Sequence, residues 1–229
     1  MMENSQKVVL IQASPKIGEP SSSEFLASLQ ELRMKEADLS VTRLDVRQSL
    51  TKKTTASAFQ TILEADAIVL TFPLYFFCLP GMLTRFLLDY HQFYLQQPVK
   101  PGHIRIYAVV NCGFPEAFIN EEAIRVVKSF SGKINADFRF GVMVGGGGML
   151  LGTKDAPFMK KTLAVLNDAF QSIAEDIANG RQEPMDNVAI HMNFPSRFYL
   201  FMGNRGWPME ARKNGLKKRD LYRKPYHPD

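Results

Sequence analysis

Residues 67–81 read AIVLTFPLYFFCLPG, an apolar run followed by an aromatic segment that lies between two prolines. The run from 67 to 72 lacks the alternation of a half-exposed strand, which predicts a strand covered on both faces, as in a parallel sheet. Pro73 withholds a backbone donor and ends the strand, and Pro80 suits the first turn of the following helix. Open α/β sheets bind ligands at the carboxyl ends of their strands. We therefore expect the three aromatic side chains between the prolines to face a flat ligand.

Apolar runs and helical patterns alternate along the first 180 residues. The sequence predicts strands at 7–12, 39–45, 67–72, 104–111 and 138–144, and helices at 21–35, 55–64, 82–94, 117–130 and 157–179. Five strands that alternate with five helices favour an α/β fold, a doubly wound parallel sheet with helices on both faces, because a barrel would need eight such units.

Basic residues gather towards the end of the chain. From Arg197 to Asp229 there are nine basic and three acidic residues, whereas the rest of the chain contains 19 basic and 20 acidic residues. We expect one domain over 1–183 and a basic, partly helical extension over 184–229, with short helices at about 198–202 and 209–214, since the extension has too few periodic apolar positions for its own core. Such a tail is typical of a solvated covering segment, and nucleic acid is not the expected partner.

Composition and motifs exclude several classes of protein. No apolar run approaches the ~18 residues of a membrane span, so we expect a cytoplasmic protein without such a span. Cys78 and Cys112 form no Cys-x-x-Cys pair, and the four histidines are not spaced as metal ligands. We therefore expect no metal site.

The loop at residues 13–23, after the first predicted strand, reads ASPKIGEPSSS. Its hydroxyls, the ammonium of Lys16 and the free amides of a helix N-terminus would attract an anion. The Gly-Lys-Ser/Thr element of a nucleotide P-loop is missing, and so are the glycines of a dinucleotide fingerprint. The loop predicts a phosphate cradle, with an ordinary polar turn and serine cap as the alternative.

The loops after later strands meet at the same edge of a parallel sheet. Side chains of residues 73–81 would face a ring, and the backbone amides of 75–77 would bind its edge; a hydrophobic plug or a dimer contact is the alternative. Residues 111–113 would bring backbone donors and a glycine that permits close approach. The glycine run at 145–148 predicts a mobile loop beside the site.

Together these loops resemble the flavodoxin-like family of NAD(P)H-dependent FMN reductases and NAD(P)H quinone reductases. The resemblance covers about residues 7–180 and rests on Ser-Pro-Lys with the three serines, on Pro-Leu-Tyr with Pro-Gly-Met-Leu and Asp89, and on Asn-Cys-Gly. It implies the strand order 2-1-3-4-5, FMN as the cofactor and NAD(P)H as the reductant. It also implies a homodimer, with the helix at 82–94 as a candidate face. Ala13 stands where the family often has glycine, and Lys16 replaces its usual arginine.

The resemblance also implies a role for each matched residue. The phosphate and ribityl groups would be bound by Ser14, Lys16, Ser21, Ser22 and Ser23. The flavin ring would be lined by Pro73, Leu74, Tyr75 and Phe76, and its pyrimidine side by Asn111, Cys112 and Gly113. No side chain would be catalytic, because the flavin carries the chemistry, and Tyr75 would at most position the acceptor.

The implied function is an oxidoreductase that moves a hydride from NAD(P)H through FMN to a small acceptor such as a quinone or a flavin. One alternative is a flavodoxin-like electron carrier serving protein partners, although such carriers are usually strongly acidic. Another is a binder of nucleic acid or an anionic surface that uses the basic tail. A phosphatase would need a Cys-x5-Arg loop, which the sequence lacks because six residues separate Cys78 from Arg85. A receiver domain would need an acidic residue at the end of the third strand, where the sequence has Thr71-Phe72-Pro73.

Overall fold

The computed structural model describes residues 5–100, 102–180, 183–192, 195–224 and 226. The chain divides into two compact units, Met1–Met192 and Asn193–Asp229. The boundary expected after residue 183 lies before β6 (Val188–Ile190), a strand that pairs with the sheet of the first unit. No helix in the described residues is long and apolar enough to cross a membrane. The same residues contain no group of three His, Cys, Asp or Glu placed to hold a metal ion.

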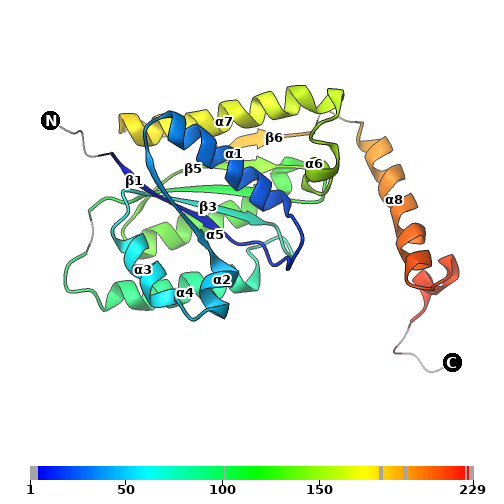
Figure 1. The fold of residues 1–229 in the computed structure, drawn as a ribbon, viewed down its shortest axis with the longest axis horizontal. Coiled ribbons are helices and arrows are strands. Elements are labelled where there is room, and N and C mark those ends of the chain that lie inside the picture. The colour runs from blue at the N-terminus through cyan, green and yellow to red at the C-terminus, as the bar shows by residue number, and fades with distance from the viewer. Residues whose placement is uncertain (1–4, 101, 181–182, 193–194, 225, 227–229) are drawn as a thin grey trace. The chain divides into compact units, whose positions relative to one another are not determined.

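The first unit is built on a parallel sheet in the order β2-β1-β3-β4-β5-β6 (Figure 1). The predicted doubly wound sheet and the order 2-1-3-4-5 are confirmed, but the predicted number of strands is wrong because β6 adds a sixth. Three residues are too few to show the pattern of a strand in the sequence. The other strands are β1 (Lys7–Gln12), β2 (Ser40–Asp45), β3 (Ala67–Pro73), β4 (Arg105–Asn111) and β5 (Asp137–Val144).

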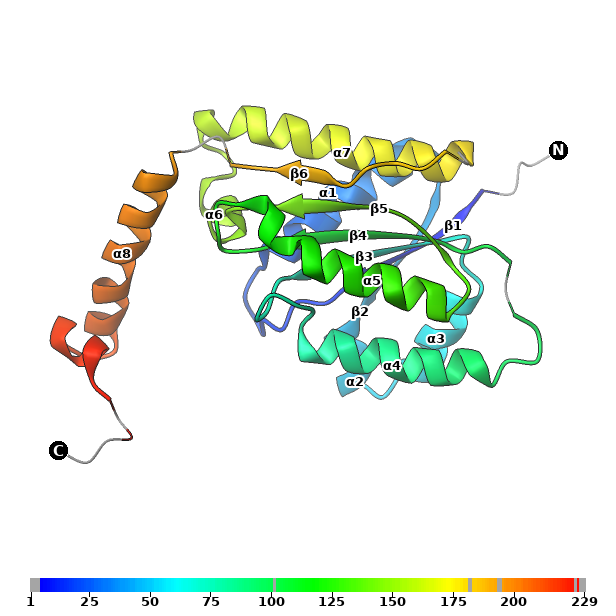
Figure 2. The same ribbon diagram turned by 180° about the vertical axis from the view of Figure 1, so that it is seen from behind.

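Helices cover both faces of this sheet (Figures 1 and 2). One face carries α1 (Ser22–Glu36), α6 (Gly147–Thr153) and α7 (Lys160–Asn179). The other face carries α2 (Val46–Thr51), α3 (Thr55–Leu63), α4 (Gly81–Leu95) and α5 (Glu121–Lys133). Short 3₁₀ turns, Ala117–Asn120 and Pro157–Met159, precede α5 and α7. With helices on both sides, the central strands β1 and β3 are buried along almost their whole length.

Local sequence explains where the main helices begin and end. Ser21 caps α1 by accepting a hydrogen bond from the Glu24 amide at 3.1 Å. α4 begins directly after Pro80, and α7 ends at Gly180, whose φ of 63° lies in the left-handed region. These signals were visible in the sequence, and the structure confirms them.

The short helix α2 was not predicted. Its N-cap is Asp45, the last residue of β2, whose carboxylate accepts a hydrogen bond from the Gln48 amide at 2.8 Å. Six residues make fewer than two helical turns, so no 3.6-residue period can be recognised. The helix matters because it carries Arg47 to the carboxyl edge of the sheet.

The second unit consists of α8 (Ser196–Lys213) and a 3₁₀ helix, η3 (Lys218–Tyr222). The sequence predicted two separate helices, at 198–202 and 209–214, where the structure has one. Gly203, Gly206 and Pro208 all lie within this single helix. A proline inside a helix removes one backbone hydrogen bond and glycine lowers the propensity, but neither change forces the chain out of the helix.

Candidate functional site

Three loops at the carboxyl edge of the sheet are joined by side-chain hydrogen bonds. The hydroxyl of Ser22, at the start of α1, donates to the carbonyl of Gly147 at 2.6 Å. The side-chain amide of Asn111, at the end of β4, donates to the Ser23 hydroxyl at 2.8 Å. The loops that follow β1, β4 and β5 therefore form one assembly.

The glycine run at 145–148 is the centre of this assembly, and its last two residues form the start of α6 rather than a loop. The amide of Gly147 donates to the carbonyl of Cys112 at 2.7 Å, and α6 begins at this residue. A Cβ on Gly145 would lie 2.2 Å from the carbonyl oxygen of Pro115. The glycines are thus needed for close packing of two loops, which a one-dimensional pattern cannot distinguish from flexibility.

The loop between β1 and α1 borders a cavity of about 390 Å³. Ser14, Lys16 and Ser21 line it, so three of the five predicted phosphate-binding residues share one cavity. Ser22 and Ser23 instead use their hydroxyls to join the loops, and Ser23 is only 1% exposed. The backbone amides of these two serines find no acceptor among the described residues, because the first amides of a helix have no partner within it.

Arg47 is a residue of this cavity that the sequence analysis missed. It lines the cavity together with Ser14 and Lys16. Its Nε atom is buried, and no described residue accepts a hydrogen bond from it. The cavity therefore presents two cationic groups to a ligand. The carboxylates that line the same cavity are those of Glu19, Glu24 and Asp45.

The loop after β3 contains a tight two-residue turn. Tyr75 and Cys78 exchange two backbone hydrogen bonds, each 2.9 Å long. Phe76 and Phe77 between them have φ values of 47° and 61°, a left-handed conformation that glycine or asparagine normally supplies in such a turn. The prediction that the Tyr75 amide binds the edge of a ring is therefore wrong, because this amide donates to the carbonyl of Cys78. The amides of Phe76 and Phe77 have no acceptor in the described chain and remain as two adjacent donors.

The residues predicted to line a ring differ in exposure along this loop. Pro73 and Leu74 are half-buried, whereas Tyr75 and Phe76 are exposed, Phe76 to 98%. The amide of Leu74 donates to the carbonyl of Asn111 at 2.8 Å, so the loops after β3 and β4 are also joined.

A stacked pair of aromatic rings bridges these two loops. The ring centroids of Phe77 and Phe114 lie 6.2 Å apart, with an angle of 17° between the ring planes. Phe77 is 58% and Phe114 49% exposed, so both rings still offer area to a ligand. Phe114 was not among the predicted site residues, because only the folded chain brings it to Phe77.

The third predicted segment, residues 111–113, is mostly inaccessible through its side chains. The Asn111 amide is used by Ser23 and by the carbonyl of Phe72, at 3.2 Å. Cys112 is buried, and this burial raises the pKa of its thiol, which stays neutral near pH 7. A Cβ on Gly113 would meet no protein atom within 4 Å, so packing in the described chain does not require glycine at this position.

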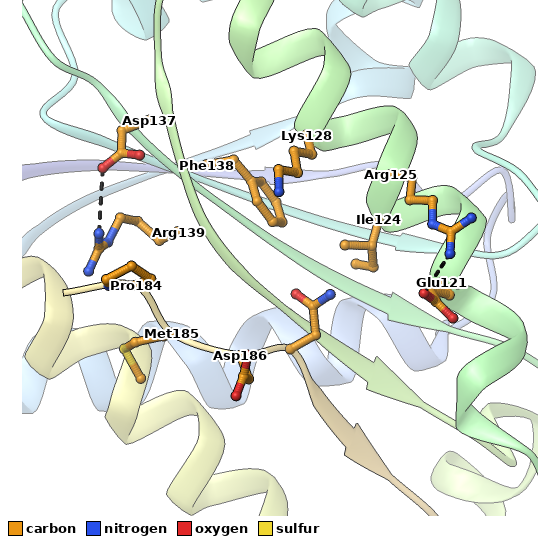
Figure 3. Close-up of a pocket in the computed structure, with 11 residues that line it drawn as sticks. Glu121, Ile124, Arg125, Lys128, Asp137, Phe138, Arg139, Pro184, Met185 and Asp186 are labelled. Atoms are coloured by element: carbon orange, nitrogen blue, oxygen red, sulfur yellow. Dashed lines mark hydrogen bonds and ion pairs between the residues drawn. The ribbon is translucent and has the colours of Figure 1, made fainter. Parts of the chain in front are cut away.

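A second cavity, of about 530 Å³, lies between α5, the beginning of β5 and the segment that leads into β6 (Figure 3). Its charged side chains include pairs: Arg139 lies 3.5 Å from Asp137, and Arg125 lies 2.8 Å from Glu121. It borders the amino end of β5, away from the joined loops, and none of the predicted site residues lines it. Its larger volume therefore does not make it the better candidate.

Solved structures with the same fold include three named oxidoreductases. An NAD(P)H:quinone oxidoreductase from Methanothermobacter marburgensis superposes with a TM-score of 0.56 at 13% identity, over 76% of this chain and 96% of that one. An NADPH-quinone reductase from P. pentosaceus gives 0.55 at 16% identity, over 74% and 97%. The apo form of an NADH:FMN oxidoreductase, EMOB, gives 0.55 at 15% identity, over 83% and 97%.

At these identities the structural likeness establishes the fold. No curated protein matches the sequence. The model of one protein family, described as having a flavodoxin-like fold, matches residues 6–123, about half of the chain. The matched region contains β1 to β4 and the loops that follow them, in the strand order expected from the sequence. The chain therefore belongs to the flavodoxin-like family.

Proposed function

We propose that this protein is an FMN-dependent oxidoreductase that moves a hydride from NAD(P)H to a quinone, a flavin or a similar small acceptor. One observation carries the proposal: a cavity with the cations of Lys16 and Arg47 lies at the same sheet edge as an aromatic turn with two free amides. FMN has one phosphate and one flat ring system, so it needs this combination. The names of the three structural neighbours support the same proposal.

The phosphate end of FMN fits the loop between β1 and α1. The amides of Ser22 and Ser23 are unpaired among the described residues and lie at the N-terminus of α1, where the helix dipole favours an anion. Ser14 and Ser21 would donate their hydroxyl protons, because each hydroxyl oxygen already accepts from a backbone amide. Lys16 would add one positive charge, as a point charge rather than the two-pronged contact of an arginine.

The ring of FMN would lie against the turn after β3. The free amides of Phe76 and Phe77 would donate to the polar edge of the ring, while Tyr75 and the half-buried Leu74 would contact its face. When bound, the flavin supplies hydride acceptance and donation, and the chain orients it and limits its contact with water. Cys112 would be a neutral neighbour, because a buried thiol adds no negative charge beside a reduced ring.

An FMN titration and a steady-state assay test this proposal directly. The purified protein should bind FMN in a fluorescence titration and should oxidise NADPH or NADH when a soluble benzoquinone is present. A protein that binds no flavin would contradict the proposal. A protein that binds FMN but turns over almost no nicotinamide would instead be an electron carrier, the alternative function left open by the sequence.

Lys16→Met should weaken FMN binding roughly tenfold to a hundredfold, because a hydrogen bond from a charged donor contributes about 1.5 to 3 kcal/mol. Lys160→Met is the control, since Lys160 is also exposed but lies at the start of α7 and outside the cavity. Titration of apoprotein with FMN measures both affinities. Equal affinities for the two variants would show that Lys16 does not contact the phosphate.

Phe76→Asn should raise the free energy of unfolding by about 1 kcal/mol, because asparagine tolerates the left-handed conformation better than phenylalanine. Phe76 is 98% exposed, so few contacts are lost. Strain of this kind is retained at functional sites, and we expect the same variant to raise the KM for an aromatic quinone. Phe118→Asn, at another exposed phenylalanine without a positive φ, should change neither quantity.

We also propose a homodimer through the α4 face. An apolar cavity of about 270 Å³ lies between α4 and α5, and Leu88 on its rim is 59% exposed. Apolar patches of this kind favour association of subunits. Light scattering on the eluting protein should give twice the chain mass, and Leu88→Glu should reduce it to one chain mass.

A further inference from the structure

The second compact unit exposes apolar and basic side chains together. Phe198, Phe201 and Trp207 are exposed on α8, as are the aliphatic side chains of Leu200 and Met209. All nine basic residues between 197 and 224 are exposed as well. Among the described apolar residues of this unit, one alanine, at position 211, is buried. The unit therefore has almost no hydrophobic core of its own.

The helix α8 is poorly suited to stand alone. It contains Gly203, Gly206 and Pro208, three residues that weaken a helix. Helices in proteins gain most of their stability by burying an apolar face rather than from propensity alone. A surface that covers the exposed rings of α8 would supply this missing stability.

Three kinds of partner can be compared by the side chains that each would use. A nucleic acid would use the basic residues but would leave aliphatic side chains such as Leu200 and Met209 in water. A second copy of the first unit would cover apolar side chains. However, residues 1–196 contain 19 basic and 20 acidic residues, so the first unit has almost no excess negative charge to attract the nine basic side chains of the second unit. An anionic lipid surface uses both features, because rings enter the interface and basic groups meet lipid phosphates.

We propose that α8 and η3 bind the surface of an anionic lipid bilayer, with α8 lying in the plane of the interface. Aromatic rings such as Phe201 and Trp207 would enter the boundary between headgroups and acyl chains. The basic cluster Lys217, Lys218 and Arg219, beside the exposed Leu221, would remain at headgroup level. The binding is peripheral, and it does not depend on the oxidoreductase activity proposed above.

Trp207 gives a direct readout, because it is the only tryptophan of the chain. Full-length protein is mixed with vesicles of phosphatidylglycerol and phosphatidylcholine, or with vesicles of phosphatidylcholine alone. With the anionic vesicles, the protein should float with the lipid in a density gradient, and the Trp207 emission should shift to the blue. Both signals should be much smaller with neutral vesicles and should weaken at high salt.

Matched variants separate the basic cluster from overall charge. Changing Lys217, Lys218 and Arg219 together to glutamine should lower the partition coefficient on the order of 100-fold, at about 1 kcal/mol for each charge. The control changes Lys52, Lys128 and Lys161, three exposed lysines of the first unit, to glutamine and should leave partitioning nearly unchanged. Equal loss in both triple variants would overturn the proposal, since binding would then follow net charge alone.

Two further outcomes would also overturn it. If Trp207 is already shielded from acrylamide without vesicles and does not respond to them, protein covers α8, either from the same chain or from a second copy. If the protein ignores anionic vesicles but binds a single-stranded oligonucleotide with strong salt dependence, the unit is a nucleic acid binder. FMN binding is measured on the same samples, so failure here stays separate from failure of the proposed function.

Discussion

Replacing Asp176 by alanine is expected to lower the free energy of unfolding by about 3 to 5 kcal/mol, because it leaves a buried guanidinium without its buried charge partner. The carboxylate of Asp176 accepts hydrogen bonds from Arg139 Nε at 2.9 Å and from the Tyr107 hydroxyl at 2.6 Å. The Asp176 and Arg139 side chains are 0% and 4% exposed, so water cannot replace the lost partner. Urea denaturation followed by circular dichroism measures the change.

Asp137→Ala is the matched control for this prediction. Asp137 also pairs with Arg139, at 3.5 Å, but its side chain is 50% exposed, so the loss should stay below about 1 kcal/mol. The double variant Arg139→Met/Asp176→Leu should recover much of the stability lost in Asp176→Ala, because it leaves neither charge in the interior. Similar losses from Asp137→Ala and Asp176→Ala would contradict the assignment of the buried pair.

The same pair makes stability depend on pH. Burial alone would raise the pKa of Asp176, but hydrogen bonds from Arg139 and Tyr107 outweigh it, and the pKa lies below the usual aspartate value. Because the folded pKa is lower than the unfolded one, this contribution is fully present above about pH 4. It is lost as the pH falls through the folded pKa. Unfolding measured from pH 6 down to pH 2 should show a shallower decline for Asp176→Asn than for the unchanged protein.

Gly147→Ala is the second change with a large expected effect, because it disturbs the contacts that join the loops. A Cβ at this position would lie 2.7 Å from Asn111 Oδ1 and 3.1 Å from the carbonyl oxygen of Cys112. The side-chain amide of Asn111 donates a hydrogen bond to the Ser23 hydroxyl, and the carbonyl of Gly147 accepts one from the Ser22 hydroxyl. Displacing Asn111 or Gly147 therefore moves the backbone amides of Ser22 and Ser23, which we propose bind the phosphate. We expect FMN affinity to fall by at least about tenfold and the free energy of unfolding to fall by about 1 to 3 kcal/mol, the usual cost of overpacking.

Gly132→Ala is the control for Gly147→Ala. Gly132 lies in α5, and an added Cβ would meet no atom within 4 Å, so alanine should raise stability by about 0.5 to 1 kcal/mol. FMN titrations on both variants are made at a temperature where circular dichroism shows them folded. Unchanged affinity in folded Gly147→Ala would show that the joined loops do not set the phosphate site.

Much of the fold could be predicted because each strand and helix has a local pattern. The apolar run at 67–72, the cap at Ser21 and the terminating Gly180 are signals between residues that are neighbours in the chain. The elements that were not predicted, β6 and α2, have three and six residues, which are too few to show a periodic pattern. The continuous helix α8 escaped for another reason, since Gly203, Gly206 and Pro208 lower helix propensity without excluding the helix.

The location of the site could be predicted from the sequence, but several of the contacts between its residues could not. Parallel strands bring their following loops to one edge, so Ser14, Lys16 and the turn at 75–78 could be expected together from order alone. Arg47 was missed because nothing near it in sequence marks it, and the ring of Phe114 was missed although this residue directly follows Gly113. Their meaning depends on a cavity and a stacked ring that exist only after distant segments meet.

The amino-acid sequence was sufficient for the parallel α/β architecture, the family resemblance and the edge where a ligand would bind, since all three follow from local periodicity and motif order. Folding settled how the loops are held. The glycine run packs closely against the loop after β4, and the hydroxyls of Ser22 and Ser23 form hydrogen bonds with other loops. Phe76 and Phe77 adopt left-handed backbone conformations in a tight turn. These outcomes depend on contacts between residues up to 125 positions apart, such as Ser22 with Gly147, and such contacts leave no trace in a local pattern.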